Sequence, residues 1–121
     1  MNAPEKYTSW RWESIEQEKK LTFIEDTKIP NAGLFILGKE DHTLGNLIRI
    51  QLLRDPSVRF AGYRMPHPLT FDCHIKVQTT DSRTTPVNVF LVALNDLSAE
   101  TRTLEKSFEE ALASYELSEG L

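Results

Sequence analysis

The 121-residue chain has little of several features that mark particular classes of protein. It has one cysteine, Cys73, which excludes an internal disulfide and fits a reducing compartment. No apolar run reaches the roughly 18 residues of a membrane-spanning helix, and the polar N-terminus does not have the pattern of a signal peptide. Its 14 Lys and Arg against 18 Asp and Glu give a net charge of −4. We therefore expect no membrane contact and no direct nucleic-acid contact, because binding to a phosphate backbone needs clustered positive charge.

Signatures of hydrolytic catalysis are also missing. Asp41-His42 could suggest an acid–base pair, but residues adjacent in sequence rarely point at each other, and a triad needs a nucleophile. Ser57 and Ser82 lie in turn-like stretches without the glycines of a nucleophile elbow. We therefore expect no catalytic residue, although a small enzyme or anion-binding domain that uses Asp41 and His42 remains an alternative hypothesis.

Metal and phosphate sites are equally poorly supported. Cys73 and His74 are neighbours on a predicted strand and would face opposite ways, so they cannot chelate one ion together. The stretch 43–46 lacks the glycine-rich turn and the lysine of a phosphate-binding loop. A capped helix start is the favoured interpretation there, and we expect no cofactor and no metal.

The periodicity of the first 85 residues predicts four short strands and one helix. The expected strands cover 21–24, 32–37, 58–65 and an alternating stretch that begins at Phe71. With a second helix at the end of the chain, the order is β-β-α-β-β-α. This order predicts an α+β domain with a mostly antiparallel sheet and helices on one face.

The first helix is expected from Thr43 to about Arg54, with Thr43 as the favoured N-cap and Asp41 as the alternative. At about 100° per residue, one side of it forms an apolar stripe that can cover the sheet. That stripe consists of Leu44, Leu47, Ile48 and Leu52. Ile50 and Leu53 lie nearly opposite, and a helix that is apolar on two sides is buried on two sides.

The last helix, expected over 86–117, has the most informative periodicity. Thr85-Pro86 is typical of an N-cap followed by proline at the first helical position. Thereafter a heptad seam recurs at spacings of three and four, with one polar member. The seam consists of Val87, Phe90, Leu94, Leu97, Thr101, Leu104, Phe108, Ala111 and Tyr115.

The length of this helix exceeds the size of the domain before it. About 30 helical residues span about 45 Å, whereas a body of about 85 residues should be only about 30 Å across. The seam must therefore extend beyond its own domain, and its second half needs another chain. We expect one domain over 1–121, with an arm over 1–18, an α/β body over 19–85 and the helix over 86–117. In the arm, Trp10 and Trp12 are expected to pack on the body.

Four stretches resemble, in the same order, the family of small alpha-like subunits of RNA polymerases, which includes archaeal subunit L. They read "EDHTLGN" (40–46), "QLLRDP" (51–56), "FAGYRMPHPL" (60–69) and "KVQTT" (76–80). The family motif within them is Asp41, His42, Thr43, Leu44, Gly45 and Asn46. The second and third stretches are similar to the version of the eukaryotic polymerase II, its eleventh subunit. The version shared by polymerases I and III is the alternative.

The resemblance implies a non-catalytic, nuclear subunit that forms an obligate heterodimer with the third, larger alpha-like subunit. It implies a platform for the two large catalytic subunits, of which the largest is the expected contact. It further implies that the first helix and the last helix meet their counterparts in the partner. Gly45 leaves little bulk at the first turn, which suggests close approach of the partner's backbone. The expected interface is Leu44, Gly45, Ile48, Ile50, Leu53, Leu97, Thr101, Leu104, Phe108, Ala111 and Tyr115.

Overall fold

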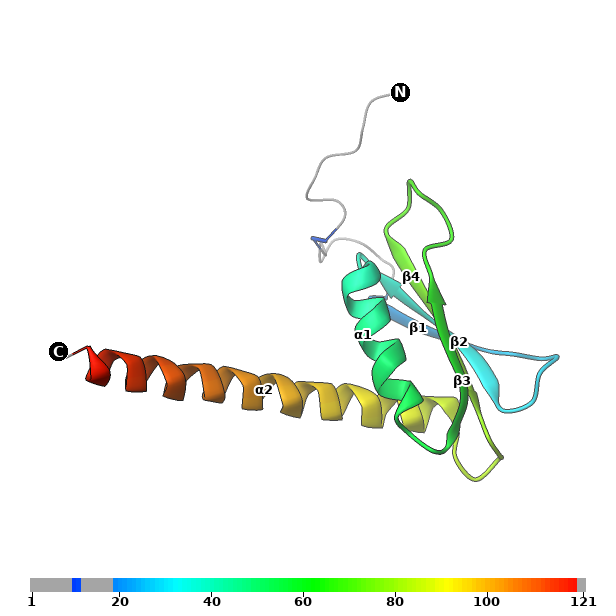
Figure 1. The fold of residues 1–121 in the computed structure, drawn as a ribbon. Helices are drawn as coiled ribbons and strands as arrows, with labels where there is room; N and C mark the ends of the chain where they lie inside the picture. Colours follow the sequence, from blue (N-terminus) through cyan, green and yellow to red (C-terminus); the bar gives the residue numbers. More distant parts are fainter. Residues whose placement is uncertain (1–9, 12–18, 120–121) are drawn as a thin grey trace.

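The computed structural model describes residues 10–11 and 19–119, which form a sheet with two helices on one side of it (Figure 1). The order along the chain is β-β-α-β-β-α, so the predicted α+β class and element order are confirmed. The elements are β1 (Leu21–Glu25), β2 (Ala32–Gly38), α1 (His42–Leu53), β3 (Val58–Arg64), β4 (Asp72–Thr79) and α2 (Pro86–Ser118).

The sheet is antiparallel throughout, with strand order β1-β2-β4-β3, so that β1 and β3 are its edges. In the central pair, Phe35 of β2 lies opposite Ile75 of β4. Because side chains alternate between the two faces of a strand, this register sends one set of apolar residues toward the helices. The predicted alternation in β4 is confirmed, with Cys73 fully buried and His74 half-buried on the other face.

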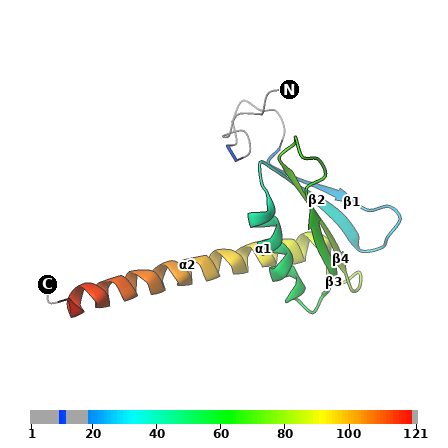
Figure 2. The ribbon, with the colours of Figure 1, turned by 45° about the horizontal axis from the view of Figure 1, so that its top comes forward.

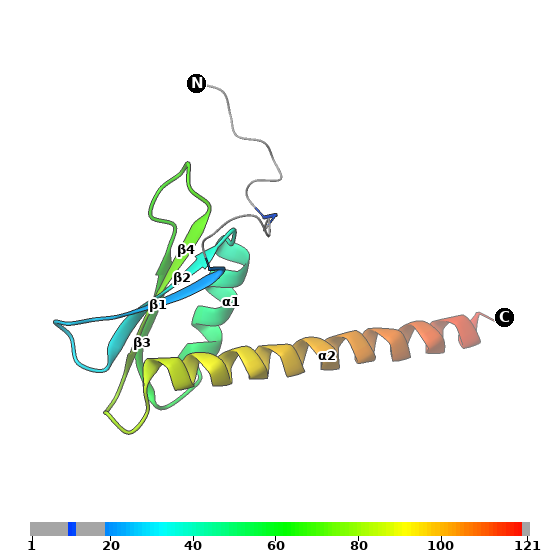
Figure 3. The ribbon, with the colours of Figure 1, turned by 180° about the vertical axis from the view of Figure 1, so that it is seen from behind.

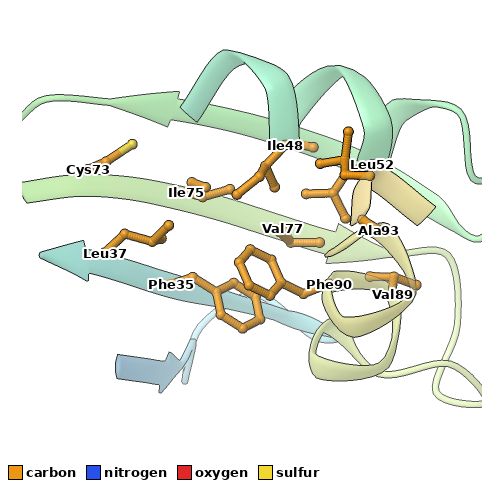
Figure 4. Close-up of a cluster of buried hydrophobic side chains, with 12 residues drawn as sticks. Phe35, Leu37, Ile48, Leu52, Cys73, Ile75, Val77, Val89, Phe90 and Ala93 are labelled. Atoms are coloured by element: carbon orange, nitrogen blue, oxygen red, sulfur yellow. The ribbon is translucent and has the colours of Figure 1, made fainter. Parts of the chain in front are cut away.

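The core lies between the sheet and the two helices (Figure 4). The rings of Phe35 and Phe90 stack at its centre, with centroids 3.9 Å apart and planes within 9° of parallel. The core residues that the helices contribute are Ile48 and Leu52 from α1 and Val89, Phe90, Ala93 and Leu97 from α2. The first half of α2 therefore covers its own sheet.

Side-chain caps define where both helices begin. Asp41, not Thr43, is the N-cap of α1, because Asp41 Oδ1 accepts a hydrogen bond from the Thr43 backbone N–H at 2.8 Å. The favoured prediction was wrong and its alternative correct. Thr85 caps α2 as predicted: its Oγ1 accepts from the Asn88 N–H at 3.2 Å, and Pro86 occupies the first helical position.

The predicted N-terminal arm falls almost entirely outside the described residues, and Trp12 is among those not described. Trp10 is described and is 67% exposed, so the predicted packing of this indole on the body is wrong. The assignment of 1–18 as an arm stays a prediction.

Candidate interaction surface

The second half of α2 projects beyond the sheet without support from the rest of the described chain (Figure 3). The helix has 33 residues, which corresponds to about 50 Å. Leu97 is its last buried residue, and every position from 98 to 118 is exposed. The prediction that the seam overshoots its own domain is therefore confirmed.

The exposed part of α2 carries large apolar side chains on one side. Leu104 is 71% exposed, Phe108 68% and Tyr115 62%. At about 100° per residue, these positions lie on the same side of the helix as Phe90 and Leu97, which are buried against the sheet. One continuous stripe thus covers the chain's own sheet at its start and faces solvent at its end.

Thr101, the polar member of the seam, already has a partner for its hydroxyl. Its Oγ1 donates to the backbone carbonyl of Leu97 at 2.8 Å, one turn back in the same helix. An apolar surface could cover this residue without leaving its donor unpaired, since an unpaired buried hydroxyl would destabilise the contact. Thr101 is therefore compatible with an apolar interface.

The heptad pattern missed part of this surface. Leu112, four residues after Phe108 and three before Tyr115, is half-exposed and widens the stripe. The omission has a simple cause, because the pattern counted only the two main seam positions of each heptad. Residues four and three apart are neighbours on a helix, and this spacing is the signal that could have found Leu112.

Helix α1 has its own exposed apolar stripe on the side away from the sheet. Ile50 and Leu53 are half-exposed there, as their place on the helical wheel predicts. Leu47 joins them at 47% exposure, so its assignment to the sheet-covering stripe was wrong. The buried side includes Gly45 and Gln51. Helix α1 is thus rotated about its axis so that its Gly45 side contacts the sheet, and this rotation turns Leu47 outward.

Two residues of the predicted interface lie inside the chain's own core, which corrects that prediction. Ile48 is fully buried. A Cβ on Gly45 would lie 2.7 Å from Cys73 Sγ and 2.7 Å from Tyr63 Cδ2, so the close approach at Gly45 is made by the chain's own sheet. Neither residue can contact a partner while the domain is folded. Leu44 is half-buried against the same core, and Leu97 is 9% exposed.

The polar residues of the 41–46 motif form structural hydrogen bonds. His42 Nδ1 lies 3.0 Å from Tyr63 Oη, with the two rings edge to face. Asn46 Oδ1 accepts from Arg49 at 3.1 Å (Nε) and 2.6 Å (Nη2). Asp41 accepts from Thr43 rather than facing His42 as a base-orienting carboxylate. The motif thus fastens the start of α1 to β3, and these contacts give no support to an acid–base pair.

Electrostatics around the motif agree with this structural role. Hydrogen bonds from Thr43, the backbone N–H first, hold the pKa of Asp41 below its ordinary value of 3.8. Burial, followed by the charges of Glu40 and Asp41, raises the pKa of the Cys73 thiol to about 11. A thiol with so high a pKa is almost entirely protonated at neutral pH and is a poor nucleophile.

The described residues contain neither a cluster of metal ligands nor a membrane-spanning helix. Among residues 10–11 and 19–119, no three His, Cys, Asp or Glu side chains are grouped as ligands for a metal ion. In the same part of the chain, no helix is both long and apolar enough to cross a membrane.

An ion pair marks the point where α2 leaves the domain. Arg54 Nη1, just after α1, lies 3.2 Å from Glu100 Oε1, one turn beyond the last buried residue of α2. Both side chains are largely exposed, so the pair adds at most about 1 kcal/mol to stability. It links α1 to the start of the projecting segment.

A comparison with protein families identifies the family to which these two exposed helix surfaces belong. A family described as "RNA polymerase Rpb3/Rpb11 dimerisation domain" matches residues 32–107, from β2 into the projecting half of α2. The chain belongs to this family. The matched region of the dimerisation domain includes all of α1 and the exposed Leu104.

Curated relatives of this dimerisation domain cover nearly the whole chain. "Probable DNA-directed RNA polymerase II subunit RPB11" of Caenorhabditis briggsae is 46% identical over 112 residues, 93% of this chain and 88% of the relative. The corresponding rpb11 subunit of Dictyostelium discoideum is 46% identical over 91% of this chain and 89% of its own length. RPB11 of Schizosaccharomyces pombe is 40% identical, with 89% and 85% covered.

The fold is also that of an archaeal subunit. The crystal structure of DNA-directed RNA polymerase subunit L from Thermoplasma acidophilum aligns with a TM-score of 0.66 at 25% identity. The alignment covers 79% of this chain and 91% of subunit L.

Proposed function

We propose that this dimerisation domain is a non-catalytic assembly subunit of RNA polymerase II and forms a heterodimer with the third, larger alpha-like subunit. The observation that carries the proposal is the row of large apolar side chains on α2 beyond Leu97, which the chain itself leaves exposed. Soluble proteins seldom keep such rows in water unless a partner covers them. In a family of dimerisation domains, the occupant is the paired subunit.

The proposed interface consists of two surfaces that one partner can contact together. The first is the second half of the seam on α2, from Thr101 to Tyr115, together with Leu112. The second is the outward stripe of α1, formed by Leu47, Ile50 and Leu53. Figure 1 shows α2 extending past α1 and away from the sheet, on the side of the sheet that α1 covers. A helical partner placed in the angle between the helices would cover both.

Within this proposal the chain is one dimerisation domain over 1–121, and the heterodimer is the platform on which the two large catalytic subunits assemble. The largest is the expected contact, and the compartment is the nucleus. Curated relatives named as polymerase II subunits favour this enzyme over the version shared by polymerases I and III. We expect no cofactor and no direct contact with nucleic acid, consistent with a net charge of −4.

Affinity purification of the tagged chain from nuclei, followed by mass spectrometry of the large subunits, tests the choice of polymerase. We expect the third subunit and both large subunits of polymerase II in near-equal amounts. Recovery of the large subunits of polymerases I and III instead would contradict the assignment to polymerase II and leave the family intact.

A further inference from the structure

The outer face of the sheet, turned away from both helices, contains a hollow. It is about 720 Å³ and is bounded by the β1–β2 turn and by β3. This volume lies within the range of about 300–1,000 Å³ that is typical of ligand sites. Its apolar walls are Ile24, Leu34 and Phe60, of which Ile24 and Phe60 are half-exposed. Figure 2 shows no described element over this face of the sheet.

Phe60 owes its position on this face to the glycine two residues later. A Cβ on Gly62 would lie 3.0 Å from Phe60 Cζ, so the ring rests against the bare backbone of Gly62. Packing of an aromatic ring over a strand glycine holds the ring against the sheet. Phe60 is thereby a fixed apolar wall of the hollow.

Two nitrogen-bearing side chains, Arg64 and His74, line the same hollow. Arg64 of β3 and His74 of β4 are directly opposite each other in the register. Cross-strand neighbours have Cβ atoms about 5 Å apart. Among the described residues, Arg64 has no ion-pair partner, and His74 Nδ1 is buried without any hydrogen-bond partner. Lys76, by contrast, forms an ion pair, with its Nζ 3.6 Å from Asp26 Oδ2.

The composition of the hollow indicates the chemistry of what it would bind. The guanidinium of Arg64, which has no ion-pair partner among the described residues, lies beside an imidazole and suits a carboxylate, since charge-assisted bonds of this kind are short and directional. The apolar walls suit an aliphatic or aromatic side chain next to that carboxylate. Glu25 and Asp26 also line the hollow, and Asp26 already pairs with Lys76, so the carboxylate is placed at Arg64 and His74 rather than beside them. Nucleic acid fits poorly, because the chain has a net charge of −4.

We propose that the outer face of the sheet docks a segment of another polymerase subunit, with a carboxylate on Arg64 and His74 and an apolar neighbour against Phe60. The inference rests on the proposed function, because it takes the occupant from the same polymerase. The hollow and the proposed dimer surfaces lie on opposite faces of the sheet. The chain can therefore hold the third subunit on one side and a further subunit on the other.

Site-specific photo-cross-linking in the assembled polymerase tests this docking. A photoreactive phenylalanine analogue replaces Phe60 in one preparation and exposed Leu69, in the β3–β4 loop, in a control. We expect the position-60 probe to capture an Asp- or Glu-containing peptide of another polymerase subunit that the control does not capture. Capture of a second copy, of nucleic acid or of this chain's own residues, or no capture at all, would overturn the proposal.

Charge reversal provides a second measurement. Arg64→Glu should lower the yield of that cross-link by about tenfold or more, since one partner of a desolvated charge pair is reversed. Arg83→Glu, in the turn before α2, should leave the yield unchanged. Heterodimer formation with the third subunit should survive both changes. If it survives and Arg64→Glu has no effect on cross-linking, the docking proposal alone fails; if the unsubstituted chain forms no heterodimer, the proposed function fails.

Discussion

Gly45 of α1 lies directly against Cys73 of β4: a Cβ on Gly45 would be 2.7 Å from the Cys73 sulfur. The same Cβ would be 2.7 Å from the edge of the Tyr63 ring, so the helix backbone is in contact with two strands at this point. This contact sets how closely α1 packs on the sheet. It therefore also sets the position of the outward stripe of α1.

Gly45→Ala should destabilise the domain, although alanine favours helix by about 1 kcal/mol relative to glycine. Overpacking at a buried contact typically costs about 1–3 kcal/mol, because the neighbours must shift. We expect a net loss of unfolding free energy in urea denaturation, partly restored in the double variant Gly45→Ala/Cys73→Ala, where the sulfur is absent. A Gly45→Ala domain more stable than the parent would show that the contact is loose.

Substitutions at the start of α1 distinguish the two candidate N-cap residues, Asp41 and Thr43. Asp41→Ala should lower the unfolding free energy by about 1 kcal/mol, the usual cost of losing an N-cap, whereas Asp41→Asn should cost much less. Thr43→Ala is the comparison variant and should cost less, because alanine keeps the backbone N–H that donates to the cap and removes only the hydroxyl. Equal losses at both positions in thermal unfolding would contradict Asp41 as the cap.

The same cap should depend on pH in a defined direction. The pKa of Asp41 is lower in the folded state than its ordinary value of 3.8, so the unfolded state binds the proton more readily. The stabilisation is fully present above the unfolded pKa and is lost as pH falls through the lowered folded pKa. The stability difference between the parent and Asp41→Ala should therefore be constant near neutral pH and shrink below about pH 4. A difference that grows on acidification would contradict this sign.

Cys73 should be inert in the folded protein. Its thiol is fully buried and has a pKa of about 11, so little thiolate exists at pH 8 and no reagent reaches it. We expect a thiol-specific chromogenic reagent to react only as fast as the domain unfolds, with the rate rising in urea. Immediate stoichiometric reaction under native conditions would show that the thiol is accessible.

The two halves of α2 should respond differently to charge. Phe108→Asp should leave the fold of the isolated chain intact, because Phe108 is exposed, and should weaken pairing with the third subunit by about 100-fold or more. Leu97→Asp should also unfold the domain, because Leu97 belongs to its core. Ala113→Asp, on the opposite side of α2, is the matched control. Co-purification of the third subunit with Phe108→Asp at parental yield would exclude the seam from the interface.

The overshoot of α2 could be predicted from the sequence because it depends only on quantities that the sequence contains. The length of the uninterrupted apolar repeat gives the length of the helix, and the number of residues before it gives the diameter of the body. The helix is longer than the body is wide. The alternation of buried and half-buried residues along β4 and the start of α2 at Thr85-Pro86 also depend only on residues that are close in sequence. These patterns located the exposed stripe of Leu104 and Phe108 without any knowledge of packing.

The errors arose where tertiary packing decides. A glycine has no side chain to place on a helical wheel, so the burial of Gly45 depends on Cys73 and Tyr63, which come from two distant strands. The rotation of α1 on the sheet, which exposes Leu47, follows from the same contact. Asp41 and Thr43 are both good capping residues, and the choice between them depends on how the chain leaves β2, where Lys39 has a φ of 58°.

The mass of the chain in solution, alone and with the third subunit, tests the central claim most directly. Sedimentation of the isolated chain should show self-association or aggregation, with binding of a hydrophobic dye, because the stripe on α2 is uncovered. Co-expression with the third subunit should give a one-to-one complex that no longer binds the dye. A very stable, dye-free monomer that forms no complex with the third subunit would contradict the account.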